Sequence, residues 1–462
     1  MPPVRARDAV FRYISEVQTR SPVIAAYVLA DDRSRSSTEL ADWLTRRAAG
    51  IGVLRQRVVS PYGHLGDDYW SFARDFNATE HVHVHEMTHW NQACELLTRV
   101  QAENFDWSRP AWSIHIARGV TGVGPWDHPC VVVILSIHHS VTDGAGAADI
   151  MRTLFSPEIP TVVSGWTISR AGATMRGLVT SPLWGPRLVR DVFAAVRAQR
   201  RLRDDMIAGR LSTPPAPSPV TALNGMVTTA RRAADVVFVP FPQLRATATA
   251  IGEVKVNDVV LATIGRALAH YLGDADRDLV GCIRISTRSV EITDARNSLM
   301  LGVVDLHTTT SDFVDQARAI HADTQEERER ALSPHALAAH AAVPPRLPGF
   351  AFRLIAAARR RREPVTMAEV LTHTGISSVT EGPVDGRQLC GIPVLASFGL
   401  AVVGGQSALE HMVYSIGDTV AVSINTDPEQ LTDLPRYVAE LRAAFADIFG
   451  SWPTGEPAER AG

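Results

Sequence analysis

Residues 131–144 read VVVILSIHHSVTDG, and this stretch decides how the rest of the chain is interpreted. Residues 131–137 form an apolar run interrupted only by Ser136, which is typical of a strand covered on both faces. A helical pattern resumes over residues 146–155. The pattern predicts that the two histidines lie on a turn between a buried strand and a helix, where side chains can point into a cleft.

The residue types of this turn fit proton-transfer chemistry. Imidazole, with an unperturbed pKa of about 6.5, is mostly unprotonated at neutral pH and can take the proton of a hydroxyl that must become a nucleophile. Asp143 could hold the turn by pairing with a buried arginine, and Gly144 allows a tight turn. In the alternative interpretation the histidines are only packed. The complete seven-residue pattern after a buried strand favours the chemical interpretation.

Composition indicates a folded protein of two domains. The 462 residues exceed one ordinary core, and 45% of them are hydrophobic while 21% are charged. A net charge of -3 and the lack of a recognition motif favour no nucleic-acid partner. Four scattered cysteines without a CxxC pair, no signal-peptide pattern and no apolar run of about 18 residues predict a cytoplasmic protein, at most attached to a membrane surface.

A connector divides the chain into two halves of mixed strand and helix content. Residues 212–219, STPPAPSP, can form neither a helix nor a central strand, because proline fixes φ and lacks a backbone donor. An arginine-rich amphipathic segment, residues 186–207, precedes them. We therefore expect an N-terminal half over residues 1–160, a connector over residues 161–225 and a C-terminal half over residues 226–462.

Two basic segments are candidates for contact with a membrane surface. One is the connector segment, residues 186–207. The other is a short, mostly apolar stretch, residues 350–358, that is followed by arginines at residues 359–362. Interfacial helices combine an apolar face with basic residues in this way, although a solvated basic helix end is the alternative.

A competing motif occurs at residues 85–89, where HEMTH matches the HExxH pattern of zinc proteases. That chemistry requires a helix that brings both histidines to one face. However, His81, His83 and His85 alternate with valines, which is the period of a strand. We therefore interpret HEMTH as a chance match, and we expect no metal site.

The HHxxxDG pattern at residues 138–144 is the signature of a superfamily that includes chloramphenicol acetyltransferase and the condensation domains of peptide synthetases. Within it, the chain resembles the bacterial wax ester synthase/diacylglycerol acyltransferase family over most of its length. Further matches follow in the family's order: SRPAW at residues 108–112, LNG at 223–225, two arginines at 231–232, NDVVLA at 257–262, RISTR at 284–288 and Asn297.

The resemblance implies an α/β fold of the chloramphenicol acetyltransferase type, with two domains and a tunnel between the halves. The acyl donor would enter from one side and the acceptor from the other. By the same resemblance His139 is the general base, His138 supports it, and Asp143 and Gly144 shape the turn. The acceptor would attack the thioester directly, without an acyl-enzyme and without a metal or redox cofactor.

Three more residues join the candidate site through the resemblance. Arg288 is the expected partner of Asp143. Asn257 and Asp258 would lie near the site, although both also fit the N-cap of a helix that begins there.

The resemblance predicts O-acyl transfer from an acyl thioester, acyl-CoA, to a hydroxyl of a lipophilic acceptor. The alternative is a natural-product tailoring or condensation-type acyltransferase, which takes its acyl group from CoA or an acyl carrier protein and transfers it to a hydroxyl or an amine. A non-catalytic scaffold is a third class, and the intact HHxxxDG pattern counts against it.

Departures from the family's pattern keep the alternative open. Residues 377–383 read SSVTEGP where the family has S-N-V-P-G-P. Ala111 and Ser113 replace a leucine and a glutamate, and Arg296 replaces the glycine before Asn297.

Overall fold

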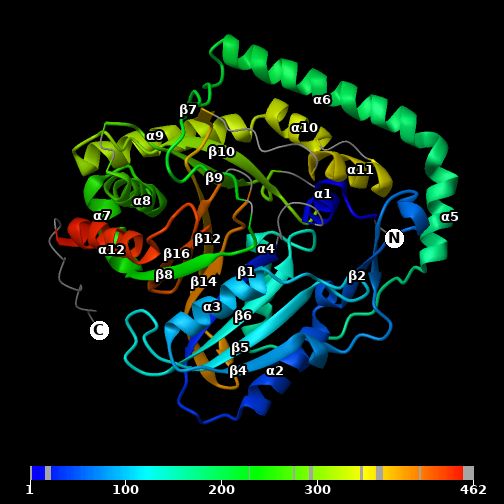
Figure 1. Cartoon of the computed structure of the whole chain (residues 1–462), viewed down its shortest axis with the longest axis horizontal. Coiled ribbons are helices and arrows are strands. Elements are labelled where there is room, and N and C mark those ends of the chain that lie inside the picture. The colour runs from blue at the N-terminus through cyan, green and yellow to red at the C-terminus, as the bar shows by residue number, and fades with distance from the viewer. Residues whose placement is uncertain are drawn as a thin grey trace, which may run out of the picture.

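The computed structural model describes residues 3–15, 22–227, 229–273, 276–290, 295–343, 347–360, 368–404 and 407–450. Two six-stranded sheets form its centre, and helices pack around them (Figure 1). Within these residues, no helix is both long and apolar enough to span a bilayer.

The first sheet contains the strand that precedes the two histidines. In spatial order its strands are β13 (Gln388–Leu389), β14 (Ile392–Leu400), β1 (Pro22–Ala30), β6 (Cys130–His138), β5 (Trp112–Val120) and β4 (Val82–Glu86). Neighbouring strands run antiparallel except β4 and β5. All nine residues of β6 are buried, because strands flank it on both sides and hydrophobic cores cover both faces. The buried strand predicted over residues 131–137 is confirmed.

The second sheet is built from the later part of the chain. Its strands are β10 (Leu299–Asp305), β9 (Val280–Ser286), β12 (Thr374–Gly382), β15 (Leu409–Ile416), β16 (Thr419–Thr426) and β8 (Ala233–Pro240). β12 runs parallel to β9 and to β15, and the other pairs are antiparallel. Two short ribbons pair β2 (Gln56–Val59) with β3 (Tyr69–Phe72), and β7 (Ser218–Pro219) with β11 (Glu369–Val370).

Twelve α-helices are defined within the described residues. They are α1 (Ala6–Ser15), α2 (Ser37–Gly50), α3 (Trp90–Gln101), α4 (Gly144–Phe155), α5 (Arg170–Thr180), α6 (Trp184–Ile207), α7 (Phe241–Ile251), α8 (Val256–Leu272), α9 (Phe313–Ala331), α10 (Pro334–Ala342), α11 (Gly349–Arg360) and α12 (Leu434–Gly450). The predicted helices at residues 146–155 and 186–207 are confirmed as α4 and α6. The long helix α6 lies along the outside of the molecule, where it packs on α10 (Figure 1).

The two sheets share a hydrophobic core. Alternate residues of β1 point to opposite faces, as strand geometry requires. Tyr27 faces the core that contains residues of α2 and α4, whereas Ile24 and Ala26 face a core with residues of α3. This second core also contains Val236 of β8 and Ala421 of β16, which belong to the other sheet.

Strand β14 crosses from the later part of the chain into the first sheet. It pairs antiparallel with β1, where Ile24 lies opposite Leu400. A buried polar contact ties the sheets together nearby, since Glu381 of β12 accepts hydrogen bonds from Tyr27 of β1 and from Arg387. A boundary at residue 226 therefore does not separate the two sheets.

The HExxH residues do not share a helix. His85 and Glu86 are the last residues of β4, and α3 begins only at Trp90. The prediction that His83 and His85 belong to a strand is confirmed, whereas His81 ends a short 3₁₀ helix instead.

Candidate active site

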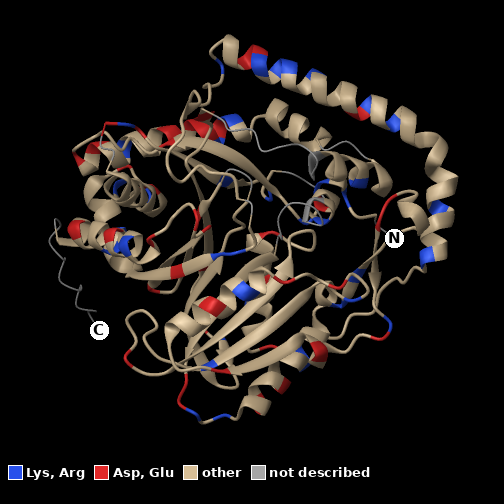
Figure 2. Ribbon diagram, in the orientation of Figure 1, with Lys and Arg blue, Asp and Glu red and all other residues tan. Residues whose placement is uncertain are grey.

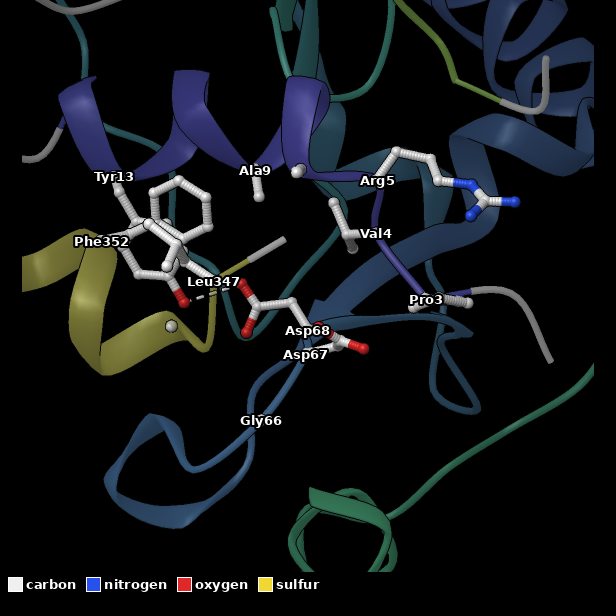
Figure 3. A pocket seen from close by; sticks show the side chains of 12 residues that line it. Pro3, Val4, Arg5, Ala9, Tyr13, Gly66, Asp67, Asp68, Leu347 and Phe352 are labelled. Carbon is white, nitrogen blue, oxygen red and sulfur yellow. Dashed lines mark hydrogen bonds between the residues drawn. The ribbon is translucent and has the colours of Figure 1, made fainter. Parts of the chain in front are cut away.

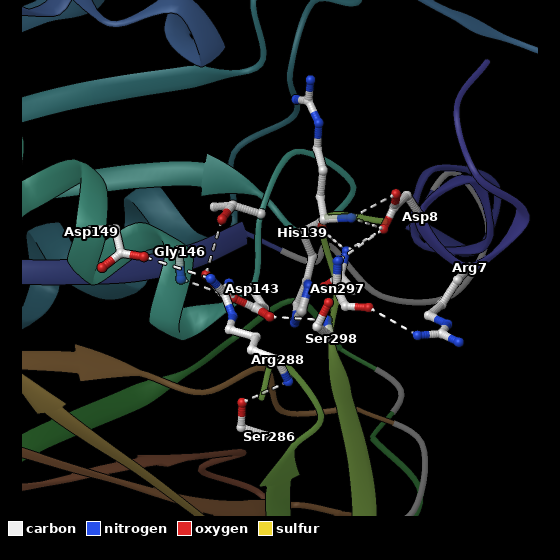
Figure 4. A network of polar contacts seen from close by, with 12 residues as sticks. Arg7, Asp8, His139, Asp143, Gly146, Asp149, Ser286, Arg288, Asn297 and Ser298 are labelled. Atoms are coloured by element: carbon white, nitrogen blue, oxygen red, sulfur yellow. Dashed lines mark hydrogen bonds and ion pairs between the residues drawn. The ribbon is translucent and has the colours of Figure 1, made fainter. Parts of the chain in front are cut away.

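The two histidines lie where a buried strand ends and a helix begins. His138 is the last residue of β6, and α4 starts at Gly144. Asp143 caps this helix, because its Oδ1 accepts a hydrogen bond 2.9 Å long from the backbone N–H of Gly146. Figure 4 shows the polar contacts around this turn.

His138 is enclosed and held in one orientation. Its Nδ1 accepts a hydrogen bond from the backbone N–H of Ser140 at 3.1 Å, and the Ser140 hydroxyl lies 2.9 Å from the same atom. The ring of Trp107 meets it edge-on, with centroids 4.7 Å apart. Burial, together with the nearby His139 and Arg12, lowers the pKa of His138 to about 3. His138 is therefore neutral near pH 7.

His139 is half-buried and stacks on an aromatic ring from α1. Its ring lies parallel to that of Phe11, with centroids 4.1 Å apart and an interplanar angle of 4°. Burial lowers the pKa of His139, although its own backbone carbonyl, Asp143 and Asn297 act in the opposite direction. Its Nδ1 is buried and has no hydrogen-bond partner within the described part of the chain. The ring is therefore a neutral imidazole at physiological pH, which is the form that can accept a proton.

A buried network outside the motif fixes the backbone of His139. The side-chain amide of Asn297 donates to the His139 carbonyl at 2.8 Å and to Oδ1 of Asp8 at 2.8 Å (Figure 4). Asp8 also accepts from the backbone N–H groups of Arg296 and Asn297. Sequence reasoning assigned no role to Asp8 or Phe11, since both belong to a helix more than 120 positions before the motif.

Asp143 joins the two sheets at the site. Its carboxylate forms an ion pair with Arg288, which follows β9, and accepts a hydrogen bond 3.1 Å long from the backbone N–H of Ser298. Arg288 also lies 3.6 Å from the carboxylate of Asp149 (Figure 4). The pairing of Asp143 with Arg288 that the sequence suggested is thus present.

Two glycines allow this turn to pack closely. A Cβ at Gly144 would lie 3.0 Å from Cε of Met412, and a Cβ at Gly146 would lie 2.0 Å from the hydroxyl oxygen of Thr142. The distance at Gly146 is far shorter than real Cβ contacts, so a side chain is tolerated less at Gly146 than at Gly144. The HHxxxDG pattern ends at Gly144 and gave no signal for Gly146.

Asn257 and Asp258 have different surroundings. Asp258 accepts a hydrogen bond from the backbone N–H of Lys255, the true N-cap of α8, and contacts Nδ1 of His321 at 2.6 Å. The prediction that either residue is itself the N-cap is therefore wrong by two or three positions. Asn257 instead accepts a hydrogen bond from Ser378 of β12. The next residue of this strand, Val379, faces Gly144.

A groove of about 770 Å³ lies beside the motif. We call it the motif groove; its lining includes Val141, Thr142 and Gly146, together with Arg288 and Arg296. His139 is not part of its lining. The groove is large enough for a substantial part of a small-molecule substrate.

A cavity under α1 is too small for a substrate. It measures about 30 Å³, and Tyr13 and Asp68 line it (Figure 3). The Tyr13 hydroxyl donates to Asp68 at 2.9 Å, and Arg12 forms an ion pair with the same carboxylate. This space accommodates one or two water molecules at most.

Comparison with known proteins identifies the family. The model of the wax ester synthase/diacylglycerol acyltransferase catalytic domain matches residues 4–260, and that of the WS/DGAT C-terminal domain matches residues 296–449. The chain belongs to this family. It is 24% identical over 372 residues to Tgs4 of Mycobacterium tuberculosis, named a probable diacylglycerol O-acyltransferase, with 74% of each chain covered. The protein is accordingly an acyltransferase, whose substrates are an acyl donor and an alcohol acceptor.

Solved structures show the same fold. The wax ester synthase/diacylglycerol acyltransferase of Marinobacter aquaeolei VT8 superposes with a TM-score of 0.65 at 18% identity, over 97% of this chain and 99% of that one. The first condensation domain of the calcium-dependent antibiotic synthetase superposes with a TM-score of 0.57 at 14% identity, over 96% of each chain. The predicted α/β fold of the chloramphenicol acetyltransferase type is confirmed.

Proposed function

We propose that this acyltransferase moves an acyl group from acyl-CoA to a hydroxyl of a lipophilic acceptor, with His139 as the general base. The observation that carries the proposal is the state of the His139 ring. It is neutral, half-buried and stacked on Phe11, and its backbone is anchored by Asn297. A base held in one position can take a proton as the acceptor oxygen attacks.

In the proposed reaction the proton taken up by His139 is returned within the same catalytic cycle, and one ester bond forms as one thioester bond breaks. The acceptor hydroxyl gives its proton to His139 while its oxygen attacks the thioester carbonyl. The carbon–sulfur bond then breaks, and the imidazolium returns the proton to the departing thiolate. His138 positions the turn through Ser140, and Asp143 and Gly144 hold the start of α4 against the second sheet.

Free-thiol release tests this proposal. The substrates are acyl-CoAs of several chain lengths, each with hexadecanol, diacylglycerol or no acceptor. We expect acceptor-dependent release that falls about a hundredfold to ten-thousandfold in His139→Ala, because a general base typically contributes that much. His83→Ala, which removes an exposed histidine from β4, serves as the matched control. Full turnover in a folded His139→Ala variant would refute the role of this base.

The second candidate function is acyl transfer from a carrier protein in natural-product synthesis, to a hydroxyl or an amine. The departure from the family at residues 377–383 favours it, because part of this segment borders the site: Ser378 contacts Asn257, and Val379 faces Gly144. Competition between acyl-CoA and an acyl-loaded carrier protein separates the two functions. Transfer that only the carrier protein supports would replace the first proposal with the second.

We also propose that the protein contacts a membrane surface through α5 and α6. Apolar side chains stand exposed along these helices, namely Met175, Leu178, Val179, Val189, Val192, Phe193 and Val196, and Leu183 is exposed in the short 3₁₀ turn between them. Arginines lie beside them on α6, where they can attract anionic lipids (Figure 2). Three exposed apolar residues of the neighbouring α11 extend this surface, whereas Arg361 and Arg362 lie outside the described residues.

Vesicle sedimentation tests the membrane contact. Phe193, 68% exposed at the centre of this surface, is changed to glutamate, and binding to phosphatidylglycerol vesicles is measured. Binding should fall in Phe193→Glu and persist in Ile159→Glu, which changes an equally exposed residue outside α5 and α6. Equal binding of both variants would contradict the proposal.

A further inference from the structure

The guanidinium group of Arg296 makes only some of the hydrogen bonds that it could donate. Its Cζ lies 3.6 Å from the centre of the Trp70 ring, and its Nη2 donates to the side-chain oxygen of Gln56. Its Nη1 is buried and has no hydrogen-bond partner among the residues that the structure describes. No described carboxylate forms an ion pair with it, because Asp8 binds the backbone N–H of Arg296 instead of the side chain.

A partly buried cation without a carboxylate partner is costly, so its presence calls for a reason. Burial lowers the pKa of Arg296 to about 10, although the charge of Asp8 opposes this, and the side chain remains charged near pH 7. The other arginine of the motif groove is different: Arg288 pairs with Asp143 and Asp149. Arg296 is therefore the positive charge of the groove that still lacks an anion within the described structure.

The groove combines this charge with apolar walls. Val53, Phe72, Val141, Ile150 and Val163 line it together with Arg296 and Gln56. An apolar group would pack against the first set, and an anionic group would complete the hydrogen bonds of the guanidinium. Such a lining suits a molecule that has an apolar part and an anionic group.

We propose that Arg296 is the binding subsite for a carboxylate or phosphate group of a substrate that occupies the motif groove. This inference rests on the proposed acyl transfer and narrows its substrate class to anionic amphiphiles. Arg296 directly precedes Asn297, which holds the carbonyl of the proposed base. The anion belongs either to the acceptor, as a hydroxy acid or a phosphorylated alcohol, or to the phosphates of CoA.

A binding measurement tests the subsite without turnover. Calorimetry compares octyl phosphate and octanoate with neutral octanol as probes for the purified full-length protein. We expect octyl phosphate or octanoate to bind about tenfold to a hundredfold more weakly to Arg296→Gln than to the unaltered protein, the worth of a charged hydrogen bond. Arg296→Lys should recover part of the loss. Octanol should bind both proteins equally.

A second groove supplies the matched control. Arg109 lines a separate cavity of about 580 Å³ with Arg57 and Arg74, so Arg109→Gln removes a cation from that place instead. Affinity for both anions should be unchanged in Arg109→Gln. If Arg109→Gln lowers the affinity for the anions and Arg296→Gln does not, the anion binds in the other groove and the proposal is overturned. Equal affinity of all variants for the anions would also overturn it. The same holds if neither anion binds to the unaltered protein.

Turnover then identifies which substrate supplies the anion. If the acceptor supplies the anion, the unaltered protein acylates 12-hydroxydodecanoate in preference to its methyl ester, and Arg296→Gln loses this preference. If CoA does, the variant has a raised KM for dodecanoyl-CoA and an unchanged KM for dodecanoyl-pantetheine, which lacks the phosphates of CoA. Absence of all transfer would contradict the proposed function while leaving the calorimetric result on Arg296 intact.

Discussion

Replacing Asp143 with alanine should destabilise the fold as well as slow catalysis. The change removes the cap of α4 at Gly146, the acceptor for the buried N–H of Ser298 and the ion pair with Arg288. The cap contributes about 1 kcal/mol, and the stranded N–H of Ser298 costs about 1–3 kcal/mol. The ion pair adds less than about 1 kcal/mol, because the Arg288 side chain is 40% exposed. We therefore expect the free energy of unfolding to fall by roughly 2–5 kcal/mol.

Urea unfolding followed by tryptophan fluorescence measures this loss. Asp149→Ala is the control, since Asp149 also contacts Arg288 but is 53% exposed and caps nothing. It should cost less than about 0.5 kcal/mol, as exposed ion pairs do. An unfolding midpoint for Asp143→Ala that matches the control would refute the structural role assigned to this carboxylate.

Three further predictions concern buried polar groups. Glu381→Leu strands the buried Arg387 and should lower the free energy of unfolding by about 3–5 kcal/mol, whereas adding Arg387→Met should restore most of it; equal losses in the single and double variants would contradict this. Burial lowers the pKa of His411 to about 4, so between about pH 6.5 and 4 only the unfolded chain gains its proton, and stability falls as the pH falls. His411→Gln should therefore show a shallower decline in unfolding free energy across that window, and an identical slope would count against it. Asn297→Ala frees the carbonyl of His139 and should lower kcat about tenfold to a hundredfold, which thiol-release kinetics would detect. An unchanged kcat would exclude this anchoring role.

Local sequence patterns were sufficient for the elements that carry the motif. The apolar run before His138 predicted a covered strand, and the helical pattern after Gly144 predicted α4. The pairing of Asp143 with Arg288 followed from a family resemblance, since nothing local connects two positions so far apart. The N-cap of α8 was misjudged because Asp258 reaches back to Lys255 from inside the first turn.

Long-range features were beyond sequence reasoning. Phe11 and Asp8 reach the site only because α1 packs beside the turn, and an amphipathic helix pattern does not reveal its neighbours. The unsatisfied guanidinium of Arg296 likewise depends on the ring of Trp70 in a distant strand. The sequence showed that Arg296 departs from the family but could not show what surrounds it.

Because β14 pairs with β1, the first sheet cannot be completed until the later part of the chain has been synthesised. Ile24 and Leu400 pair although roughly 375 positions separate them, so β1 emerges from the ribosome long before its neighbour. At typical synthesis rates of about 5–20 residues per second, β1 waits about 20–75 s with one edge open. An open edge invites pairing with other chains. Expression of residues 1–225 alone should therefore give an aggregating fragment, which co-expression of residues 226–462 should rescue by supplying the missing strand.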